Sequence, residues 1–293
     1  MSIAQHATLA GLAAILAWSF LSLLTVMSGQ VPPFQLAAMT FAIGGSLGVI
    51  LFMRGGPIAV LRQPLAVWLL GVGGLFGYHA LYFMALRLAP PAEAQLVNYL
   101  WPLLIVLFSA LLPGERLRPH HVVGTLLGLG GTVLLFIDRG GFTFALEYLP
   151  GFAAALAASF AWAIYSVLSR LFAAAPTTTV AGFCLATAAL SALCHLLFEE
   201  THWPASPAQW LAVLALGVGP VGLAFYAWDV GVKRGDIRVL GVSSYAAPLL
   251  STGYLVLAGY AAASLALALA ALMIAVGGLI AAKDMIVPPR PRQ

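Results

Sequence analysis

The chain has 293 residues, of which 62% are hydrophobic and only 8% are charged, and its mean hydropathy is +1.01. A water-soluble domain could not bury so much apolar surface, and about a quarter of its residues would be charged. The composition therefore excludes a soluble globular protein and indicates an integral membrane protein. The pI near 9.3 does not indicate a nucleic-acid partner. The basic residues lie between apolar runs, where anionic lipid headgroups are the natural partners.

Ten apolar runs of about 20 residues follow one another along the chain, and each is long enough to cross a bilayer as a helix. Their expected bounds are 8–28, 34–53, 66–86, 92–112, 121–137, 149–170, 178–198, 208–229, 239–258 and 262–282. The predicted fold class is an all-α integral membrane protein with ten transmembrane helices. Cys184 and Cys194 lie about 15 Å apart on one predicted helix, so no disulfide between them is expected.

The basic residues are distributed unequally between alternate loops. If the N-terminus lies in the cytoplasm, only Arg87 and Arg139 fall outside. The other eleven fall in cytoplasmic segments: Arg54, Arg62, Arg116, Arg118, Arg170, Lys233, Arg234, Arg238, Lys283, Arg290 and Arg292. Cytoplasmic loops of membrane proteins carry an excess of Lys and Arg. We therefore expect a multi-pass protein of the bacterial inner membrane with both termini in the cytoplasm.

A weak repeat relates the two halves of the chain at an offset near 146 residues. The matched pairs include Gly71 and Gly217, Gly73 and Gly219, Tyr82 and Trp228, Tyr99 and Tyr245, and Pro102 and Pro248. Because each half holds five predicted helices, an odd number, the second half would cross the membrane in the opposite sense. We expect residues 1–140 and 141–284 to form two inverted repeats around a central cavity, with a cytoplasmic tail at 285–293. Inverted repeats are typical of alternating-access carriers; an ordinary duplicated structural bundle is the alternative.

The third apolar run carries Tyr78, His79 and Tyr82 after a series of glycines that ends at Gly77. Glycines spaced three and four apart let helices approach closely, and Gly77 is expected to allow a change of conformation. His79 and Tyr82 share a helix face. An ionisable residue at membrane depth indicates a functional site, so all three side chains are candidate substrate contacts. A core histidine satisfied by a neighbouring hydroxyl is the alternative for His79.

The fourth and ninth runs are each interrupted by a proline. Pro102 removes a backbone hydrogen bond and frees a carbonyl about one turn upstream, near Asn98. Pro248 occupies the matched position in the ninth run. Two broken helices at matched positions indicate a central site, although either proline could instead set curvature alone. The candidate substrate contacts on these helices are Asn98, Tyr99, Trp101, Ser244 and Tyr245.

The first and sixth runs carry matched stripes of tryptophan and hydroxyl side chains. Trp18 is followed four residues later by Ser22, and Trp162 is followed four residues later by Ser166. With Trp228 of the eighth run, these side chains are expected to line a wet cavity with aromatic walls. Hydrogen bonding between helices is the alternative for the hydroxyl groups.

Two further ionisable residues are expected to be structural. Asp229 is expected to end the eighth helix and to pair with Lys233, Arg234 or Arg238, ahead of a role in proton coupling. His195 is expected to be a satisfied residue near the outer end of the seventh helix. Neither is a candidate substrate contact.

Four stretches together carry a family resemblance: Ala89–Ala94, Tyr99–Leu103, Gly114–Leu117 and Gly124–Gly131. They resemble the core signature of the EamA-type drug/metabolite transporters, which have ten helices in two inverted five-helix halves, and the resemblance covers essentially the whole chain. The Tyr, His and Trp content of the third and fourth helices is most similar to that of the aromatic amino-acid exporters of bacterial inner membranes, the YddG type. One departure is that Gly259 and Tyr260 stand where the first half has Gly114 and Glu115. Strict functional symmetry of the halves is therefore not expected.

The sequence contains no enzyme motif that would argue against a transport function. The sequence has no Walker loop, no His-x-x-x-His or Cys-x-x-Cys spacing for a metal, and no paired carboxylates within the apolar runs. The expected function is export of small amphipathic metabolites, and the resemblance implies aromatic amino acids and related compounds. An exporter of drugs or lipophilic cations is the alternative, and a membrane-embedded enzyme a more distant one. The expected partners are a small-molecule substrate and the lipid bilayer, with no cofactor, metal or nucleic acid; a monomer is compatible with this.

Overall fold

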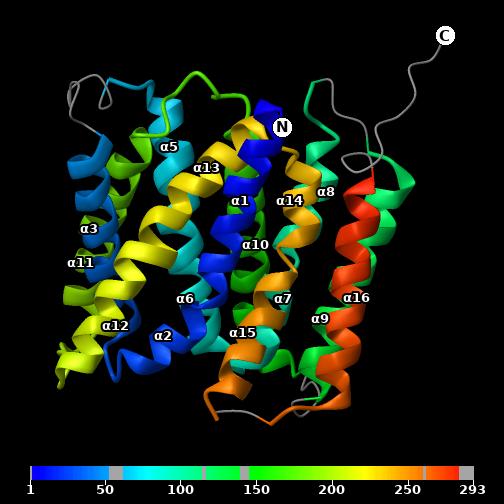
Figure 1. Cartoon of the computed structure of the whole chain (residues 1–293). Coiled ribbons are helices and arrows are strands. Elements are labelled where there is room, and N and C mark those ends of the chain that lie inside the picture. The colour runs from blue at the N-terminus through cyan, green and yellow to red at the C-terminus, as the bar shows by residue number, and fades with distance from the viewer. Residues whose placement is uncertain (1, 53–61, 114–116, 139–144, 260–261, 284–293) are drawn as a thin grey trace.

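The computed structural model describes residues 2–52, 62–113, 117–138, 145–259 and 262–283. Within these ranges every regular element is a helix, and most helices run alongside one another in a bundle (Figure 1). Nine helices in the described ranges are long and apolar enough to cross a membrane, and α16 (Leu265–Ala281) is a shorter apolar helix. Some residues that carry expectations lie outside the described residues: Arg54, Gly114, Glu115, Arg116, Arg139, Tyr260, Arg290 and Arg292.

Each membrane-length span consists of one to three consecutive helical segments. In chain order the segments are α1 (Ile3–Ser19), α2 (Leu21–Met27), α3 (Pro33–Phe52), α5 (Leu65–Val72), η1 (Gly73–Gly77), α6 (Tyr78–Leu88), α7 (Pro91–Asn98), α8 (Trp101–Ser109), α9 (Pro119–Asp138), η2 (Leu146–Tyr148), α10 (Leu149–Leu168), α11 (Thr179–Phe198), α12 (Pro207–Val218), η3 (Gly219–Leu223), α13 (Ala224–Arg234), α14 (Ile237–Ser243), α15 (Ala246–Leu257) and α16. The first span thus joins α1 and α2, the third joins α5, η1 and α6, and the eighth joins α12, η3 and α13.

Four of the interrupted spans form two matched pairs. The third and eighth spans contain π-helical segments, η1 and η3, whose first residues Gly73 and Gly219 are 146 positions apart. The fourth and ninth spans are interrupted by turns at residues 99–100 and 244–245, just upstream of the two prolines. The prolines therefore break both helices as predicted. The π-helical segments were not predicted, because one extra residue in a turn barely alters the hydropathy pattern.

The eighth span is longer than the sequence predicted. Helix α13 continues to Arg234, so Asp229 lies inside the helix and is only 2% exposed. The predicted end at Asp229 was wrong because a charged residue normally marks the edge of the apolar region. Here Lys233 pairs with the carboxylate at 2.9 Å, and this pairing permits its burial.

The two halves of the chain are interleaved. Helix α1 packs along α13, α6 along α10, α3 along α11, and α9 along α16, and each pair takes one helix from either half. Glycines allow the closest crossings. A Cβ atom at Gly231 would lie 2.7 Å from the Cα atom of Gly11, and one at Gly277 would lie 2.6 Å from the carbonyl oxygen of Gly124. Small residues at such crossings are typical of helix packing in membranes.

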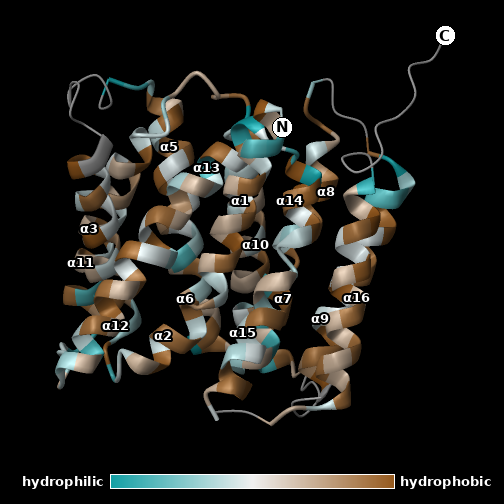
Figure 2. Ribbon diagram, in the orientation of Figure 1, coloured by the Kyte–Doolittle hydropathy of each residue, from teal (hydrophilic) through white to brown (hydrophobic). Residues whose placement is uncertain are grey.

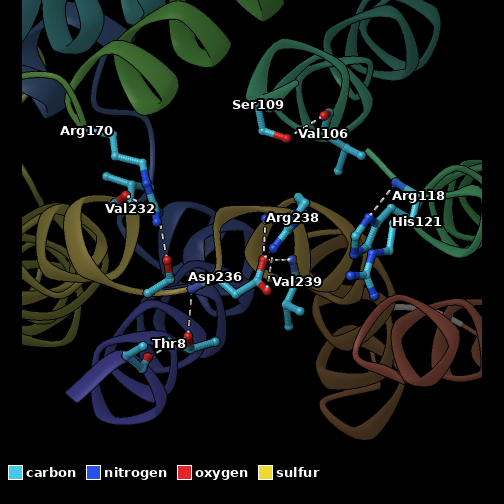
Figure 3. A network of polar contacts seen from close by, with 12 residues as sticks. Thr8, Val106, Ser109, Arg118, His121, Arg170, Val232, Asp236, Arg238 and Val239 are labelled. Atoms are coloured by element: carbon cyan, nitrogen blue, oxygen red, sulfur yellow. Dashed lines mark hydrogen bonds and ion pairs between the residues drawn. The ribbon is translucent and has the colours of Figure 1, made fainter. Parts of the chain in front are cut away.

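Polar residues are most frequent near the two ends of the bundle, and the helix surfaces between them are largely apolar (Figure 2). At the end where α1 begins, Asp236 caps α14 by accepting hydrogen bonds from backbone N–H groups, including that of Arg238. The backbone N–H of Asp236 donates to Thr8 Oγ1 at 2.9 Å, and Arg170 donates to two backbone carbonyls at the end of α13 (Figure 3). These contacts join α1, α13 and α14 to one another and to Arg170, which lies two residues beyond the end of α10.

Candidate functional site

Four tryptophan side chains from four helices meet in the core of the bundle. They are Trp18 of α1, Trp101 of α8, Trp162 of α10 and Trp228 of α13, and we name them the tryptophan cluster. Ring centroids lie 5.0 Å apart for Trp18 and Trp228, and 5.5 Å apart for Trp18 and Trp162. Trp101 lies 6.1 Å from Trp228 and 6.3 Å from Trp162, edge to face in both cases. The sequence-predicted tryptophans are thus brought into mutual contact.

Hydrogen bonds orient two of these rings. Trp228 Nε1 donates to Ser166 Oγ at 3.1 Å, across the contact between α13 and α10. Trp18 Nε1 donates to the carbonyl oxygen of Pro220 at 2.9 Å. Pro220 belongs to η3, so the π-helical segment supplies a backbone acceptor to the cluster. Ser166 therefore bonds between helices, which was the alternative for the hydroxyl stripe, and in doing so it positions a ring of the site.

Three further aromatic rings extend the cluster. The ring of Phe225 lies 5.9 Å from that of Trp18 and 5.8 Å from that of Trp162. The ring of Tyr78 lies 5.4 Å from that of Trp162, and Tyr82 stacks on Tyr78 at 6.0 Å with an interplanar angle of 4°. The third span thus adds a continuous aromatic surface to the tryptophan cluster.

His79 lies at the edge of this surface. Its ring is 5.0 Å from Tyr78 and 5.0 Å from Phe41, edge to face with both. The Nδ1 atom lies 2.7 Å from the carbonyl oxygen of Leu75. Because a carbonyl can only accept, Nδ1 is the donor in this contact, which leaves Nε2 as the acceptor whenever the ring is neutral. The partner of His79 is therefore a backbone carbonyl and not the hydroxyl that the sequence suggested as the alternative.

The break in the fourth span frees the backbone carbonyl of Asn98 from its helical hydrogen bond. Pro102 has no N–H to donate to the carbonyl of Asn98, and Ser159 Oγ supplies a donor at 2.9 Å instead. The Nδ2 atom of Asn98 donates to the Tyr78 hydroxyl at 3.0 Å. The Oδ1 atom of Asn98 is buried and has no hydrogen-bond partner among the described residues. Asn98 therefore holds an unused acceptor beside the aromatic surface.

A small cavity lies between the broken fourth and ninth spans, and we name it the polar cavity. Its volume is about 60 Å³, which is room for a few water molecules. Its polar lining is Ser22, Gln95, Tyr99, Ser251 and Thr252, with Pro248 and three apolar side chains around them. Tyr99 and Pro248, both predicted for the site, are therefore placed at this cavity.

Three predicted residues lie apart from both features. Ser244 Oγ donates to the carbonyl of Leu240 within the ninth span. The ring of Tyr245 is fully buried. It packs so closely against Gly128 of α9 that a Cβ atom at Gly128 would clash with it. Gly77 ends η1, and a Cβ atom there would meet nothing within 4 Å. Gly77 therefore contributes to the π-helical backbone and not to a close helix crossing.

One buried carboxylate joins three helix ends at the end of the bundle opposite the start of α1. Glu199 follows α11, and its side chain is only 2% exposed. It accepts hydrogen bonds from Arg87 of α6 at 3.2 Å and from the backbone N–H of Phe34, at the start of α3, at 3.1 Å. His195 Nδ1 also lies 3.1 Å from Glu199, and its Nε2 lies 2.9 Å from Thr201 Oγ1. The prediction that His195 is a satisfied structural residue is confirmed.

A second buried ion pair lies near the opposite end. Asp229 pairs with Lys233 as predicted and also accepts from Thr177 Oγ1 at 2.7 Å. Lys233 donates in addition to the carbonyl of Ala175 at 2.9 Å. Each charge is thus satisfied within the described structure. No group of three or more His, Cys, Asp or Glu side chains in the described ranges is placed to hold a metal ion.

Several residues of the site were not singled out from the sequence. Phe225 precedes Trp228 by three positions, and Ser159 precedes Trp162 by three, so helical spacing placed both on the faces already chosen. Gln95 and Ser251 carried no comparable signal. Pro220 contributes only a backbone carbonyl, which a side-chain pattern cannot reveal.

The chain is similar to known transporters over most of its length. The model of the EamA-like transporter family matches residues 6–137 and again residues 149–282. A protein of Ancylobacter novellus named aromatic amino acid exporter YddG is 64% identical over 279 residues, covering 94% of this chain and 97% of that protein. A protein of Salmonella typhimurium with the same name is 29% identical over 291 residues, covering 94% and 96%. A solved crystal structure with 63% identity superposes with a TM-score of 0.91, covering 94% of this chain and 96% of the other. The chain therefore belongs to the EamA-like transporter family and is a membrane transporter, not an enzyme.

Proposed function

We propose that this chain exports aromatic amino acids and related small amphipathic compounds across the bacterial inner membrane. The names of two relatives support this class of substrate. The observation that carries the proposal is the tryptophan cluster, which gathers rings from four helices in the core. Such walls offer stacking to an aromatic ring and cation–π contacts to an ammonium group.

The state of the site fits an alternating-access cycle. Trp101, Trp162 and Trp228 are at most 6% exposed and fill the core by contacting one another. The polar cavity is too small for an aromatic amino acid. Substrate must therefore separate the rings, and the bundle must open on one side to admit it.

Two inverted five-helix repeats, residues 1–140 and 141–284, are the architecture that we propose for this cycle. Three findings support ten transmembrane helices in this arrangement. The family model matches twice, the π-helical segments and the two proline breaks fall at matched positions, and the four most extensive helix pairs each take one helix from either half. We propose that the end of the bundle that holds Arg170 and Arg238 faces the cytoplasm and that both termini lie on that side, because the loop charges assign eleven of the thirteen Lys and Arg residues to it.

Transport into proteoliposomes tests the proposal. Purified protein should take up radiolabelled phenylalanine, tyrosine or tryptophan in a saturable manner, with competition among the three and none from alanine. Runs with and without an imposed pH gradient show whether protons are coupled. Uptake no faster than into empty liposomes would contradict the proposal. A carrier of lipophilic cations would instead require an unpaired buried carboxylate, whereas Asp229 is paired with Lys233.

A further inference from the structure

The polar cavity lies close to the tryptophan cluster along two chain segments. Ser22 of α2 follows Trp18 of α1 by four residues in the first span. Tyr99 precedes Trp101 by two residues on the broken fourth span. The first and fourth spans therefore each contribute a residue to the cavity and a ring to the cluster within a few residues of each other.

The cavity presents hydrogen-bonding groups that the protein does not use. The side chains of Ser22, Gln95 and Ser251 make no hydrogen bond with the described residues; Ser251 is only 9% exposed, and Ser22 and Gln95 are partly exposed. Buried polar groups are nearly always paired, and leaving one unpaired costs about 1–3 kcal/mol. Their hydroxyl and amide groups are therefore available to bind atoms that enter the cavity, from water or from a ligand.

The chemistry of the lining matches a zwitterion. None of the described residues around the cavity is charged. A fixed charge would favour one end of a zwitterion and repel the other, whereas Gln and Ser offer both donors and acceptors. Asp229 directly follows Trp228 in the chain, but the charges of the Asp229–Lys233 pair are already satisfied by each other, by Thr177 and by Ala175.

We infer that the polar cavity binds the α-ammonium and α-carboxylate groups of the substrate while its ring lies against the tryptophan cluster. Gln95 and Ser251 are then specificity-determining residues for the amino-acid end. This inference rests on the proposed function. A volume of about 60 Å³ suits these few polar atoms and excludes an aromatic ring, so the ring is directed to the tryptophans.

The test compares three substrates in proteoliposomes: phenylalanine, 2-phenylethylamine, which lacks the carboxylate, and 3-phenylpropionate, which lacks the ammonium group. Wild-type protein should transport phenylalanine faster than either analogue. Gln95→Leu and Ser251→Ala should each lower phenylalanine transport about tenfold, as expected for a lost hydrogen bond to a charged group. The transport rate of at least one of the two analogues should change less than twofold in each of these variants. Ser251→Thr keeps the hydroxyl and should retain most phenylalanine transport.

Ser109→Ala is the matched control, because Ser109 is a fully buried serine whose Oγ is bound to the carbonyl of Val106. It should leave the ratios among the three substrates unchanged. Unchanged ratios in both Gln95→Leu and Ser251→Ala, or equal losses for all three substrates, would overturn the assignment of the cavity. The two residues lie on different spans. If one variant fails to fold, the other variant still tests the inference. If wild-type protein transports no phenylalanine, the proposed function fails; if it does and the variants match it, only this inference fails.

Discussion

The Nε1 atom of Trp18 donates a hydrogen bond to the carbonyl oxygen of Pro220, 202 residues away, at 2.9 Å. Trp18 belongs to α1 and Pro220 to the π-helical segment η3, so the bond joins the two halves of the chain. It holds the indole of Trp18 where it contacts Trp162 and Trp228. A change in the backbone of η3 would therefore move one wall of the proposed site directly.

The walls of the tryptophan cluster can be tested by substitution. Trp101→Ala and Trp162→Ala should lower transport several-fold to about tenfold, because aromatic contacts contribute about 0.5–1.5 kcal/mol beyond the burial of area. Replacement by Phe should have a milder effect. Trp203→Ala is the control, since Trp203 is 64% exposed and stacks on Trp210 away from the cluster. Normal transport by folded alanine variants would show that these tryptophans only pack.

His79 offers a separate test of substrate contact against proton coupling. His79→Gln keeps a hydrogen-bonding side chain but removes the titratable ring. We expect a several-fold higher KM with any pH-gradient dependence intact, because the described contacts of His79 are aromatic rings and the carbonyl of Leu75. Uptake measured with and without a pH gradient distinguishes the outcomes. Loss of the gradient dependence, with KM unchanged, would identify His79 as the proton-coupling group.

The lowered pKa of Asp236 predicts that the stability of the fold depends on pH. Burial alone would raise the pKa of the Asp236 carboxyl group, but the Arg238 guanidinium and backbone N–H groups that donate to it hold the pKa below its usual 3.8. The ionised carboxylate thus stabilises the fold above pH 3.8, and this contribution is lost as the pH falls through the lower, folded-state pKa. Asp236→Ala should cost about 1 kcal/mol at pH 7, since it also removes a helix cap.

Thermal unfolding of the purified protein between pH 7 and pH 3 measures this effect. The difference between wild type and Asp236→Ala should narrow below about pH 4. A difference that stays constant from pH 7 to pH 3 would mean that the charge of Asp236 contributes nothing.

Glu199 and Glu200 form a matched pair of adjacent carboxylates. The Glu199 side chain is 2% exposed and holds Arg87 and the start of α3, whereas that of Glu200 is 94% exposed. Glu199→Gln should lower the free energy of unfolding by about 2 kcal/mol, as expected when charge-assisted hydrogen bonds are weakened. Glu200→Gln should change it little. Equal melting temperatures for the two variants would show that the hydrogen bonds of Glu199 to Arg87 and to the start of α3 do not stabilise the fold.

Reporter fusions test the proposed topology. Reporters after Gln293 and within residues 116–121 should lie in the cytoplasm, and one within residues 199–206 should lie in the periplasm, as the loop charges predict. A periplasmic reporter after Gln293 would remove the inverted arrangement of the two halves.

The helical architecture and most of the aromatic site could be predicted from the sequence, because apolar runs, prolines and tryptophans can be recognised directly in it. The burial of Asp229 could not, since it depends on Lys233 one turn further along α13. The separate position of Tyr245 depends on its packing against α9. Gln95 and Ser251 escaped notice because an isolated polar residue in an apolar helix becomes informative only when the opposing helices are in place.

The number of residues in a π-helical segment sets the direction in which the side chains of the following helix point. Each segment holds one residue more than an α-helical turn requires. Removing one residue from η1 would turn the following helix by about 100° about its axis. Tyr78 and His79 would then swing together away from their present partners. Relatives that gain or lose a single residue at this point would present another face of the same helix to their cargo, so selectivity could diverge by a change of length with every aromatic side chain conserved.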